Sequence, residues 1–458
     1  MKKLSVVLSV VLVLAMLLVG CSSKQDVQQG SQNSQGTQSS QTSQSSGSTQ
    51  KVQTIKYWYP WGGDSEKWDK WRMAEFEKDH PEYKIEATYV PPDAGISNGK
   101  LMAAIAGGNT PDVVVTSDYA SAYSLATQGA FLPLDDVLKK AGFDESKINP
   151  VFKDVMKYKG VTYIFPQDSN VNLLYYNIDM AKEAGLDTAN PPKTIDELDK
   201  WSEKLAKVSG SKIDRLGFIP WIDAGDDPYM WGYMFGANFY DVNTNKINLT
   251  DGKMEAVLNW EKTYAQKYNP EKIKSFTSGF GGAFSPDHPF MTGKIAMTTN
   301  GNWFTNALKI YAPKINYGIA PLPAPEGGRY GGSNLGTNVF FIPKGAKNVE
   351  GAAVFMMYCE QAKIMDDNIK TWRSVTIFPD DVKNLTLVKE NDKLYPIILN
   401  IVMNKNSGHT ALTSVSKQMG DDLRAIRDKV IYENADPKPL LAEEENKLQQ
   451  QVDKTASK

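Results

Sequence analysis

The chain has 458 residues, of which 41% are hydrophobic and 23% are charged, and its formal net charge at pH 7 is -2. This length is sufficient for two substantial lobes or domains, each with its own core. Because the net charge is near zero and no basic block stands out, the composition argues against a nucleic-acid partner.

The first residues indicate export. Lys2 and Lys3 precede an apolar run over 4–19, which is too short for a convincing membrane span and fits a signal peptide over 1–20. The run ends in Leu-Val-Gly-Cys, which resembles the lipobox of bacterial lipoproteins. That resemblance implies cleavage before Cys21, and acyl chains such as palmitate on that residue would anchor the protein to the cell membrane. The alternative is an ordinary secretory signal with an incidental cysteine.

The segment 21–50 is composed almost entirely of Ser, Gln, Gly, Thr and Asn. It has too few apolar side chains to offset the entropy of ordering, so we expect a disordered tether. The only other cysteine, Cys359, lies in an apolar helical stretch. We therefore expect a buried, inert thiol and a fold that stands without disulfides.

From residue 51 onward the pattern is α/β. Strands are expected over 51–59, 84–90 and 112–116, and the third is short and β-branched, which favours a buried parallel sheet. Helices are expected between them. The first runs from a cap at Asp64 or Ser65 to about residue 79, with Trp68 available for its buried side, and the second covers 97–106 and stops at two glycines.

The remainder continues the alternation of helices and strands. Thr194 and Glu197 have the spacing of a capping box and predict a helix to about residue 208. Further strands are expected over 216–219 and 295–298. The last hundred residues favour helix.

Several short strings follow one another along the body. The most distinctive is Ala-Ile-Ala-Gly-Gly-Asn-Thr-Pro-Asp-Val-Val-Val over 104–115. Others lie at 129–136, 163–166, 174–177, 184–194, 293–303, 317–323 and 331–332. In order and spacing across about 51–355, these strings resemble the extracellular solute-binding proteins of family 1, to which maltose-binding proteins are similar. The C-terminal quarter matches less distinctly.

The resemblance implies a two-lobed, type II periplasmic-binding-protein-like α/β fold. Each lobe is expected to be a mostly parallel sheet flanked by helices, with the ligand cleft at the hinge. Lobe one would comprise 51–165 and 322–371, and lobe two 166–321 and 372–458. Ligand would draw the lobes together. The implied function is that of an extracytoplasmic, monomeric, substrate-binding component of an ABC importer, which delivers a sugar or oligosaccharide to the transmembrane permease subunits.

A sugar offers hydroxyls around its rim and C–H groups on its faces. Asp and Asn side chains match the hydroxyls, and aromatic rings cover the faces. Such residues follow the expected strand ends and the crossings of the chain between the lobes, which the resemblance places near residues 163–168, 321 and 372. The candidate ligand-binding residues are Trp61, Asp64, Asp118, Tyr119, Asp168, Asn170, Asn172, Trp221, Trp303, Gly332, Trp372 and Arg373. We also expect Gly301, beside Trp303, to let the backbone approach the ligand.

Each candidate has a structural alternative. Trp221 and Trp303 could belong to the core. Asp64 and Asp118 could each cap the helix that follows. The polar residues over 168–172 could satisfy backbone groups at the hinge. Tyr229 and Trp231 are further candidates, as subsite residues for a longer glycan.

The sequence offers little for catalysis. His80, His288 and His409 are scattered and lack metal-ligand spacing, and no P-loop or nucleophile elbow is present. Asp226 and Asp227 suggest a glycosidase, but adjacent carboxylates on a loop do not set the separation that glycoside hydrolysis requires. We therefore expect no enzyme activity, metal or cofactor. A non-sugar solute, such as a polyamine, an oxyanion, a metal or a peptide, is the other binding alternative.

Overall fold

The computed structural model describes residues 51–91, 99–210, 212–409 and 412–456. The predicted signal peptide over 1–20, the tether over 21–50 and the lipidation site Cys21 lie outside the described residues. Within the described part of the chain, no helix combines the length and the apolar character needed to cross a membrane.

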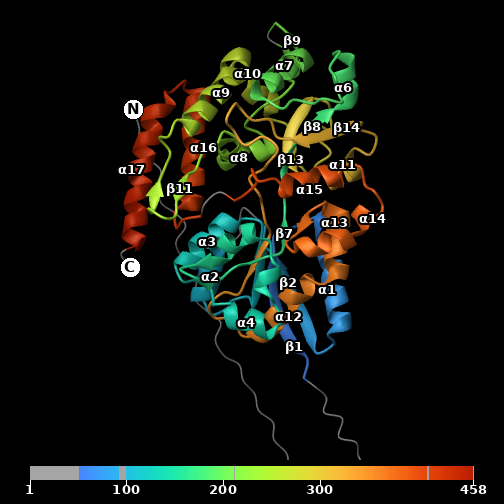
Figure 1. Ribbon diagram of the computed structural model, residues 1–458, viewed down its shortest axis with the longest axis vertical. Helices are drawn as coiled ribbons and strands as arrows, with labels where there is room; N and C mark the ends of the chain where they lie inside the picture. Colours follow the sequence, from blue (N-terminus) through green and yellow to red (C-terminus); the bar gives the residue numbers. More distant parts are fainter. Residues whose placement is uncertain (1–50, 92–98, 211, 410–411, 457–458) are drawn as a thin grey trace, which may run out of the picture. The chain divides into compact units, whose positions relative to one another are not determined.

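The first sheet has five strands in the order β2-β1-β3-β15-β6. Figure 1 shows two of them, β1 and β2, in the lower part of the view. Parallel pairs join β1 (Gln53–Tyr59) to β2 (Tyr83–Tyr89) and to β3 (Val113–Thr116). The late strand β15 (Val339–Phe341) is antiparallel to β3 and to β6 (Phe165–Pro166). The chain therefore returns to complete this sheet after leaving it.

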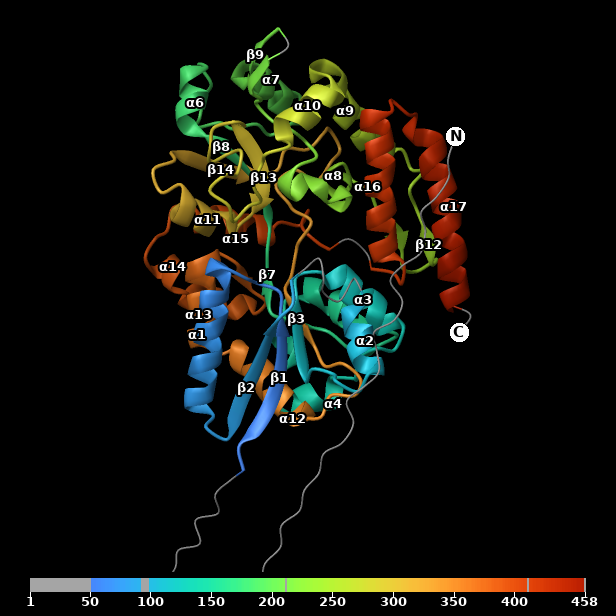
Figure 2. The ribbon, with the colours of Figure 1, turned by 180° about the vertical axis from the view of Figure 1, so that it is seen from behind.

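Alternating side chains along these strands form two cores, one on each face of the first sheet. Val113, Val115 and Phe340 pack on the face covered by α1 (Asp64–Asp79) and α12 (Val349–Cys359). Val114, Val339 and Phe341 pack on the other face, with α2 (Lys100–Ala106) and α3 (Tyr119–Thr127). The period of two in a strand explains the division. Figure 2 shows α1 and α3 on opposite sides of the sheet.

The second sheet has the order β13-β8-β14, with β8 (Asn172–Asn177) between β13 (Met297–Gly301) and β14 (Tyr317–Pro321). Both outer strands are antiparallel to β8, whereas a mostly parallel sheet was expected. The reason lies in the path of the chain. β8 begins next to the ends of β13 and β14, so it leads away from the junction of the sheets and the other two return to it.

Two-residue strands join the crossings at this junction. β7 (Asp168–Ser169) pairs with β16 (Val375–Thr376), and Asn170 forms an isolated bridge with Gly336. Three passages of the chain therefore meet here, close to the predicted crossings. The exact boundaries of the predicted lobes stay a prediction.

Two predicted helix starts can be compared with the structure. α7 (Ile195–Leu205) has both hydrogen bonds of the predicted capping box, although it ends before residue 208. The predicted cap of α1 is wrong. Gly63, with φ 61°, occupies the N-cap, and no side chain caps the helix. A residue without Cβ adopts that φ readily, and Asp64 and Ser65 are the first two residues of the helix.

Cys359 lies at the end of α12, buried and without a disulfide partner. Burial raises the pKa of its thiol to about 12. The thiolate is the reactive form of cysteine, so this side chain is held in its unreactive state.

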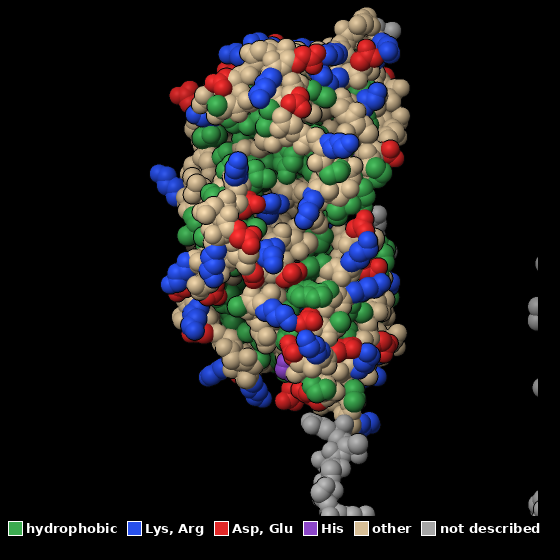
Figure 3. Space-filling model, turned by 90° about the vertical axis from the view of Figure 1, so that its right-hand side faces the viewer, with side chains coloured by type: hydrophobic (Ala, Val, Ile, Leu, Met, Phe, Trp, Pro, Cys, Tyr) green, Lys and Arg blue, Asp and Glu red, His purple; other side chains and the backbone are tan. Residues whose placement is uncertain are grey.

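Helices dominate the C-terminal region. The longer ones are α13 (Ala362–Trp372), α15 (Tyr395–Val402), α16 (Ser416–Tyr432) and α17 (Pro437–Ala456). α16 packs against both α17 and α9 (Lys253–Tyr268). The surface in Figure 3 shows Lys and Arg interspersed with Asp and Glu, so this face carries no single basic patch.

The packing of α9 buries a carboxyl group, that of Glu261, and its Oε2 has no hydrogen-bond partner. Burial raises the pKa of Glu261 to about 8, although the charge of Arg427 opposes the rise. The folded protein therefore holds this proton more tightly than the unfolded chain. The contribution of Glu261 to stability is full below its ordinary pKa of 4.5 and is lost as the pH rises toward about 8.

We therefore expect Glu261→Gln to raise the melting temperature relative to the wild type more at about pH 8 than at about pH 5, because glutamine cannot ionise. Thermal unfolding followed by circular dichroism at both pH values measures the difference. Glu443→Gln, at an exposed position on α17, is the matched control. An equal effect of Glu261→Gln at the two pH values would show that the buried carboxyl group does not titrate in this range.

Candidate ligand-binding site

A cavity of about 450 Å³ lies at the junction of the two sheets. Its size is within the range of small-molecule sites. The lining comes from segments that are far apart in the sequence: the start of α1, the end of β3, the crossings, the end of β13 and helix α13. The lining residues are Trp61, Ser65, Trp68, Ser117, Gln167, Asp168, Asn170, Asn172, Phe284, Trp303, Gly336, Thr337, Asn338, Asn368 and Trp372.

Five of these residues are aromatic. Phe284, which is 38% exposed, stacks on Trp303 with ring centroids 5.5 Å apart and an angle of 21° between the ring planes. Its ring meets Trp372 edge-on at 6.1 Å. On the other side, the indole nitrogen of Trp68 donates to Asp367 Oδ1 at 2.9 Å, which links α1 to α13. These rings give the cavity apolar faces of fixed orientation.

Trp303 owes its position to the end of β13. The strand ends at Gly301, and Trp303 is the N-cap of α11 (Phe304–Tyr311). A Cβ on Gly301 would lie 2.2 Å from the Trp303 indole nitrogen. Glycine at this position therefore makes room for the indole ring, rather than for the ligand as the sequence suggested.

The polar part of the lining is centred on Asp168, which is 1% exposed. Its carboxylate accepts from the backbone N and the side-chain Nδ2 of Asn338, and from Asn170 Nδ2. Burial raises the pKa of Asp168, and the donors of Asn338, Asn368 and Ser374 oppose the rise. The backbone carbonyl of Asp168 accepts from Thr337 Oγ1 at 2.6 Å.

Asn302 lies just behind the lining and connects its parts. Its Oδ1 accepts from the backbone N of Val171 at 2.8 Å, and its Nδ2 donates to Asn170 Oδ1 at 3.1 Å and to the carbonyl of Trp372 at 2.9 Å. This one amide ties the end of β13 to two crossings. The aromatic and polar parts of the cavity are thus held by a common network.

The lining carries no Lys, Arg or His among the residues that the structure describes, and Asp168 is its one acidic member. The cavity therefore combines aromatic faces with neutral amides and hydroxyls around one carboxylate. Such a set of groups matches an uncharged, hydroxyl-rich molecule with apolar faces.

Residues 60–365 match the family described as bacterial extracellular solute-binding protein. The chain belongs to this family. It is 31% identical to the sn-glycerol-3-phosphate-binding periplasmic protein UgpB of Shigella flexneri over 308 residues, which are 62% of this chain. The matched part spans 65% of the length of that relative, which is less than two thirds.

Solved structures of similar proteins support the fold. CpMnBP1 with mannotriose bound is 32% identical, with a TM-score of 0.79, and the match covers 86% of this chain and 99% of that one. The maltose/maltodextrin-binding domain MalE of Bdellovibrio bacteriovorus, bound to maltotriose, is 20% identical with a TM-score of 0.69, covering 87% and 99%. The fold is therefore the two-lobed α/β fold of periplasmic binding proteins, as expected.

The cavity of this solute-binding protein brings together six of the twelve residues predicted from sequence. They are Trp61, Asp168, Asn170, Asn172, Trp303 and Trp372. Their role in binding stays a prediction. The other six lie outside the lining, and each has a partner or an environment that accounts for it.

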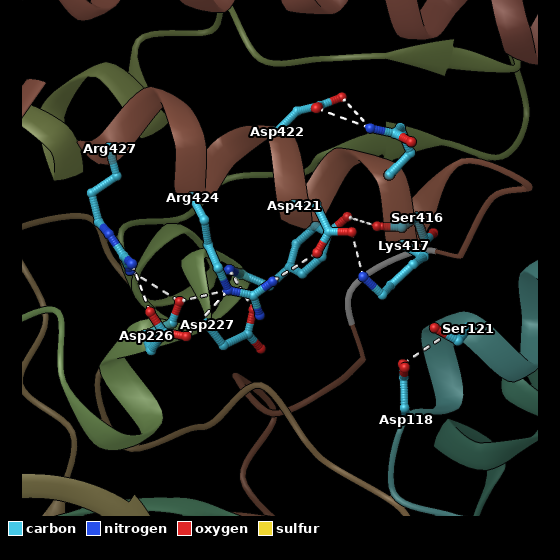
Figure 4. Close-up of polar contacts among 12 residues, drawn as sticks. Asp118, Ser121, Asp226, Asp227, Ser416, Lys417, Asp421, Asp422, Arg424 and Arg427 are labelled. Carbon is cyan, nitrogen blue, oxygen red and sulfur yellow. Dashed lines mark hydrogen bonds and ion pairs between the residues drawn. The ribbon is translucent and has the colours of Figure 1, made fainter. Parts of the chain in front are cut away.

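Two of those six are acidic. The carboxylate of Asp64 pairs with Lys67 and accepts from the hydroxyl of Tyr311 at 2.9 Å. Asp118 is the N-cap of α3 and accepts from the backbone N of Ser121 at 3.0 Å (Figure 4). Asp118 thus has the capping role that was its structural alternative.

The other four pack elsewhere in the protein. Tyr119 meets the ring of His409 edge-on, and Trp221 is 8% exposed within the core of the second sheet. A Cβ on Gly332 would lie 2.3 Å from the carbonyl oxygen of Asn406. Arg373, with φ 52°, donates to Asp392 Oδ2 at 2.9 Å.

The two subsite candidates for a longer glycan are also accounted for by the core. The hydroxyl of Tyr229 donates to the carbonyl of Ser416 at 2.6 Å. Trp231 is 0% exposed, and its indole nitrogen donates to the carbonyl of Pro220 at 2.9 Å. Neither side chain lines the cavity.

Sequence reasoning missed the other nine lining residues. Three of them, Ser65, Ser117 and Gln167, are next in sequence to predicted candidates, and this proximity was the available signal. Trp68 was assigned to the buried side of α1. The residues missed are Ser65, Trp68, Ser117, Gln167, Phe284, Gly336, Thr337, Asn338 and Asn368.

The acidic pair that suggested a glycosidase lies away from the cavity lining. Arg424 and Arg427 bind the carboxylate of Asp226 (Figure 4). Asp227 caps α8 (Pro228–Met234) by accepting from the backbone N of Tyr229, and burial raises the pKa of Asp227 to about 6. No group of three or more His, Cys, Asp or Glu side chains in the described ranges is placed to hold a metal ion.

Proposed function

We propose that this protein binds a neutral sugar or oligosaccharide in the cavity and delivers it to the membrane permease of an ABC importer. One observation carries the proposal. Aromatic rings from several elements face amides and a carboxylate, and no cationic side chain is among the described lining residues. Rings cover the C–H faces of a sugar, while amide oxygens accept from its hydroxyls.

The charge of the lining separates two ligand classes that the relatives' names suggest. UgpB is named for sn-glycerol 3-phosphate, and CpMnBP1 is described with mannotriose bound. A phosphate group is usually held by Arg or Lys. The described lining has neither, and the carboxylate of Asp168 would repel an anion. We therefore favour a neutral glycan.

Ligand capture would work by closure. The lining includes the start of α1, which packs on the first sheet. It also includes Phe284 and Trp303, which lie on the side of the second sheet. A ligand that contacts both sides binds the closed form better, and this difference in affinity drives closure. The closed form is then the one presented to the permease.

We further propose that the protein is extracytoplasmic and monomeric, is anchored through a lipidated Cys21, and does not alter its ligand. The apolar run and the Leu-Val-Gly-Cys sequence support the anchor. The positions of Asp226 and Asp227 outside the cavity lining support binding without hydrolysis.

The purified protein should bind at least one of mannobiose, mannotriose and maltotriose and should not bind sn-glycerol 3-phosphate. Thermal shift and isothermal titration calorimetry measure this, since a ligand that binds only the folded state raises the melting temperature. Chromatography after the titration should return the sugar intact. Binding of sn-glycerol 3-phosphate without any sugar would refute the neutral-glycan assignment, and cleavage products would refute a purely binding role.

The indole of Trp303 should contribute through its contact with the sugar face. Its loss in Trp303→Ala costs roughly 1–3 kcal/mol of binding, or about five- to 150-fold in dissociation constant. The melting temperature of the unliganded protein should change only slightly. Trp231→Ala is the matched control, because truncating a core tryptophan costs about 3–5 kcal/mol of stability. Unchanged affinity of Trp303→Ala for the sugar would remove this residue from the site.

The anchor is tested separately. Cys21→Ser removes the thiol that would carry the acyl chains, so the protein should appear in the medium rather than in the membrane fraction. Its affinity for the sugar should remain unchanged. Immunoblots of the two fractions measure the distribution, and retention of Cys21→Ser in the membrane fraction would contradict the lipobox assignment.

A further inference from the structure

We propose that Asp168 is a positioning residue for the sugar. It orients the amides of Asn170 and Asn338 so that Asn338 presents its carbonyl oxygen to a ligand hydroxyl, and Asp168 itself makes no hydrogen bond with the ligand. The inference rests on the proposed function, and it changes the role that the sequence suggested for this carboxylate.

The first argument is that protein donors already occupy the carboxylate. Oδ1 accepts from Asn170 Nδ2 at 3.1 Å and from the backbone N of Asn338 at 3.2 Å, and Oδ2 accepts from Asn338 Nδ2 at 3.1 Å. Burial raises the pKa of Asp168, and hydrogen bonding to its carboxylate opposes the rise. A carboxylate has about four acceptor positions. Little capacity is left for a sugar hydroxyl.

The second argument is that Asp168 determines which end of a neighbouring side-chain amide turns toward it. An ionised carboxylate only accepts, so a neighbouring amide must turn its NH₂ group toward it. Asn338 does so, and its Oδ1 accepts no hydrogen bond from the described protein groups. Asn338 is partly exposed and lines the cavity. Its carbonyl oxygen is therefore the acceptor that this part of the cavity offers to a hydroxyl.

The third argument is that the same orientation extends to the aromatic part of the cavity. Asn170 Nδ2 donates to Asp168, so its Oδ1 is free to accept from Asn302 Nδ2 at 3.1 Å. Asn302 in turn donates to the carbonyl of Trp372 at 2.9 Å and directly precedes Trp303. A carboxylate at position 168 therefore sets the direction of hydrogen bonds that run from the polar lining to the backbone carbonyl of Trp372, through the residue that precedes Trp303.

A double-mutant cycle tests the proposal. The variants are Asp168→Asn, Asn338→Ala and the two combined. The probe is whichever of mannobiose, mannotriose and maltotriose gives the wild type its largest thermal shift, and calorimetry measures the affinity. Each single variant should weaken binding about tenfold or more. If Asp168 acts through Asn338, the double variant should be no more than about threefold weaker than the weaker single variant.

Two effects that multiply would overturn the proposal, because they would mean that Asp168 and Asn338 contact the ligand independently. Wild-type affinity in Asn338→Ala would also overturn it, and this result stands even if Asp168→Asn does not fold. Absence of binding by the wild type to all three sugars would instead refute the proposed function on this panel.

Asp112→Asn is the matched control for general destabilisation. Asp112 is 3% exposed and accepts from the backbone N of Lys56, Lys347 and Asn348 at 2.7–2.8 Å. It has a similar set of donors but does not line the cavity. Asp112→Asn should lower the melting temperature and leave the affinity unchanged. Equal losses of affinity in Asp112→Asn and Asp168→Asn would mean that the loss at position 168 comes from general destabilisation. That result would overturn the positioning role.

Discussion

The meeting of three chain passages between the two sheets is the constraint on which the cavity depends. Backbone pairing is scarce there, since β7 and β16 are two residues long and Asn170 adds one bridge to Gly336. Side-chain hydrogen bonds that Asp168 accepts and that Asn302 donates add further connections. Buried polar groups of this kind must be paired, and pairing them fixes their geometry. The groups that hold the passages together therefore also shape the binding surface.

Much of the fold could be predicted because its signals are local. The first three strands, the helices between them and the capping box at Thr194 follow from alternation and from cap spacing within a few residues. The antiparallel direction of the second sheet could not be predicted in this way. It depends on where β13 and β14 end relative to the start of β8, and residues more than a hundred positions apart decide that.

The candidate site was predictable where a residue follows a strand end, as Trp303 does, or lies next to a crossing, as Trp372 does. Trp68 was missed because helical spacing assigned it to the buried side of α1, whereas its indole is held by Asp367, 299 positions away. Asn338 gave no signal, since its place in the lining depends on contact with Asp168. Conversely, Asp64 and Asp118 were predicted as ligand contacts from their residue type. In the structure, Asp64 accepts from the hydroxyl of Tyr311, and Asp118 caps the start of α3.

The position of β15 has a consequence for how the chain folds. This strand lies between β3 and β6, so β6 joins the first sheet only through it. β3 ends at residue 116 and β15 begins at residue 339, and closing so long a loop is entropically unfavourable and slows folding. A nascent chain cannot complete its first sheet until nearly three quarters of it has been synthesised. That delay keeps the N-terminal half in an incompletely folded state, the state in which a polypeptide can still be threaded through a narrow channel.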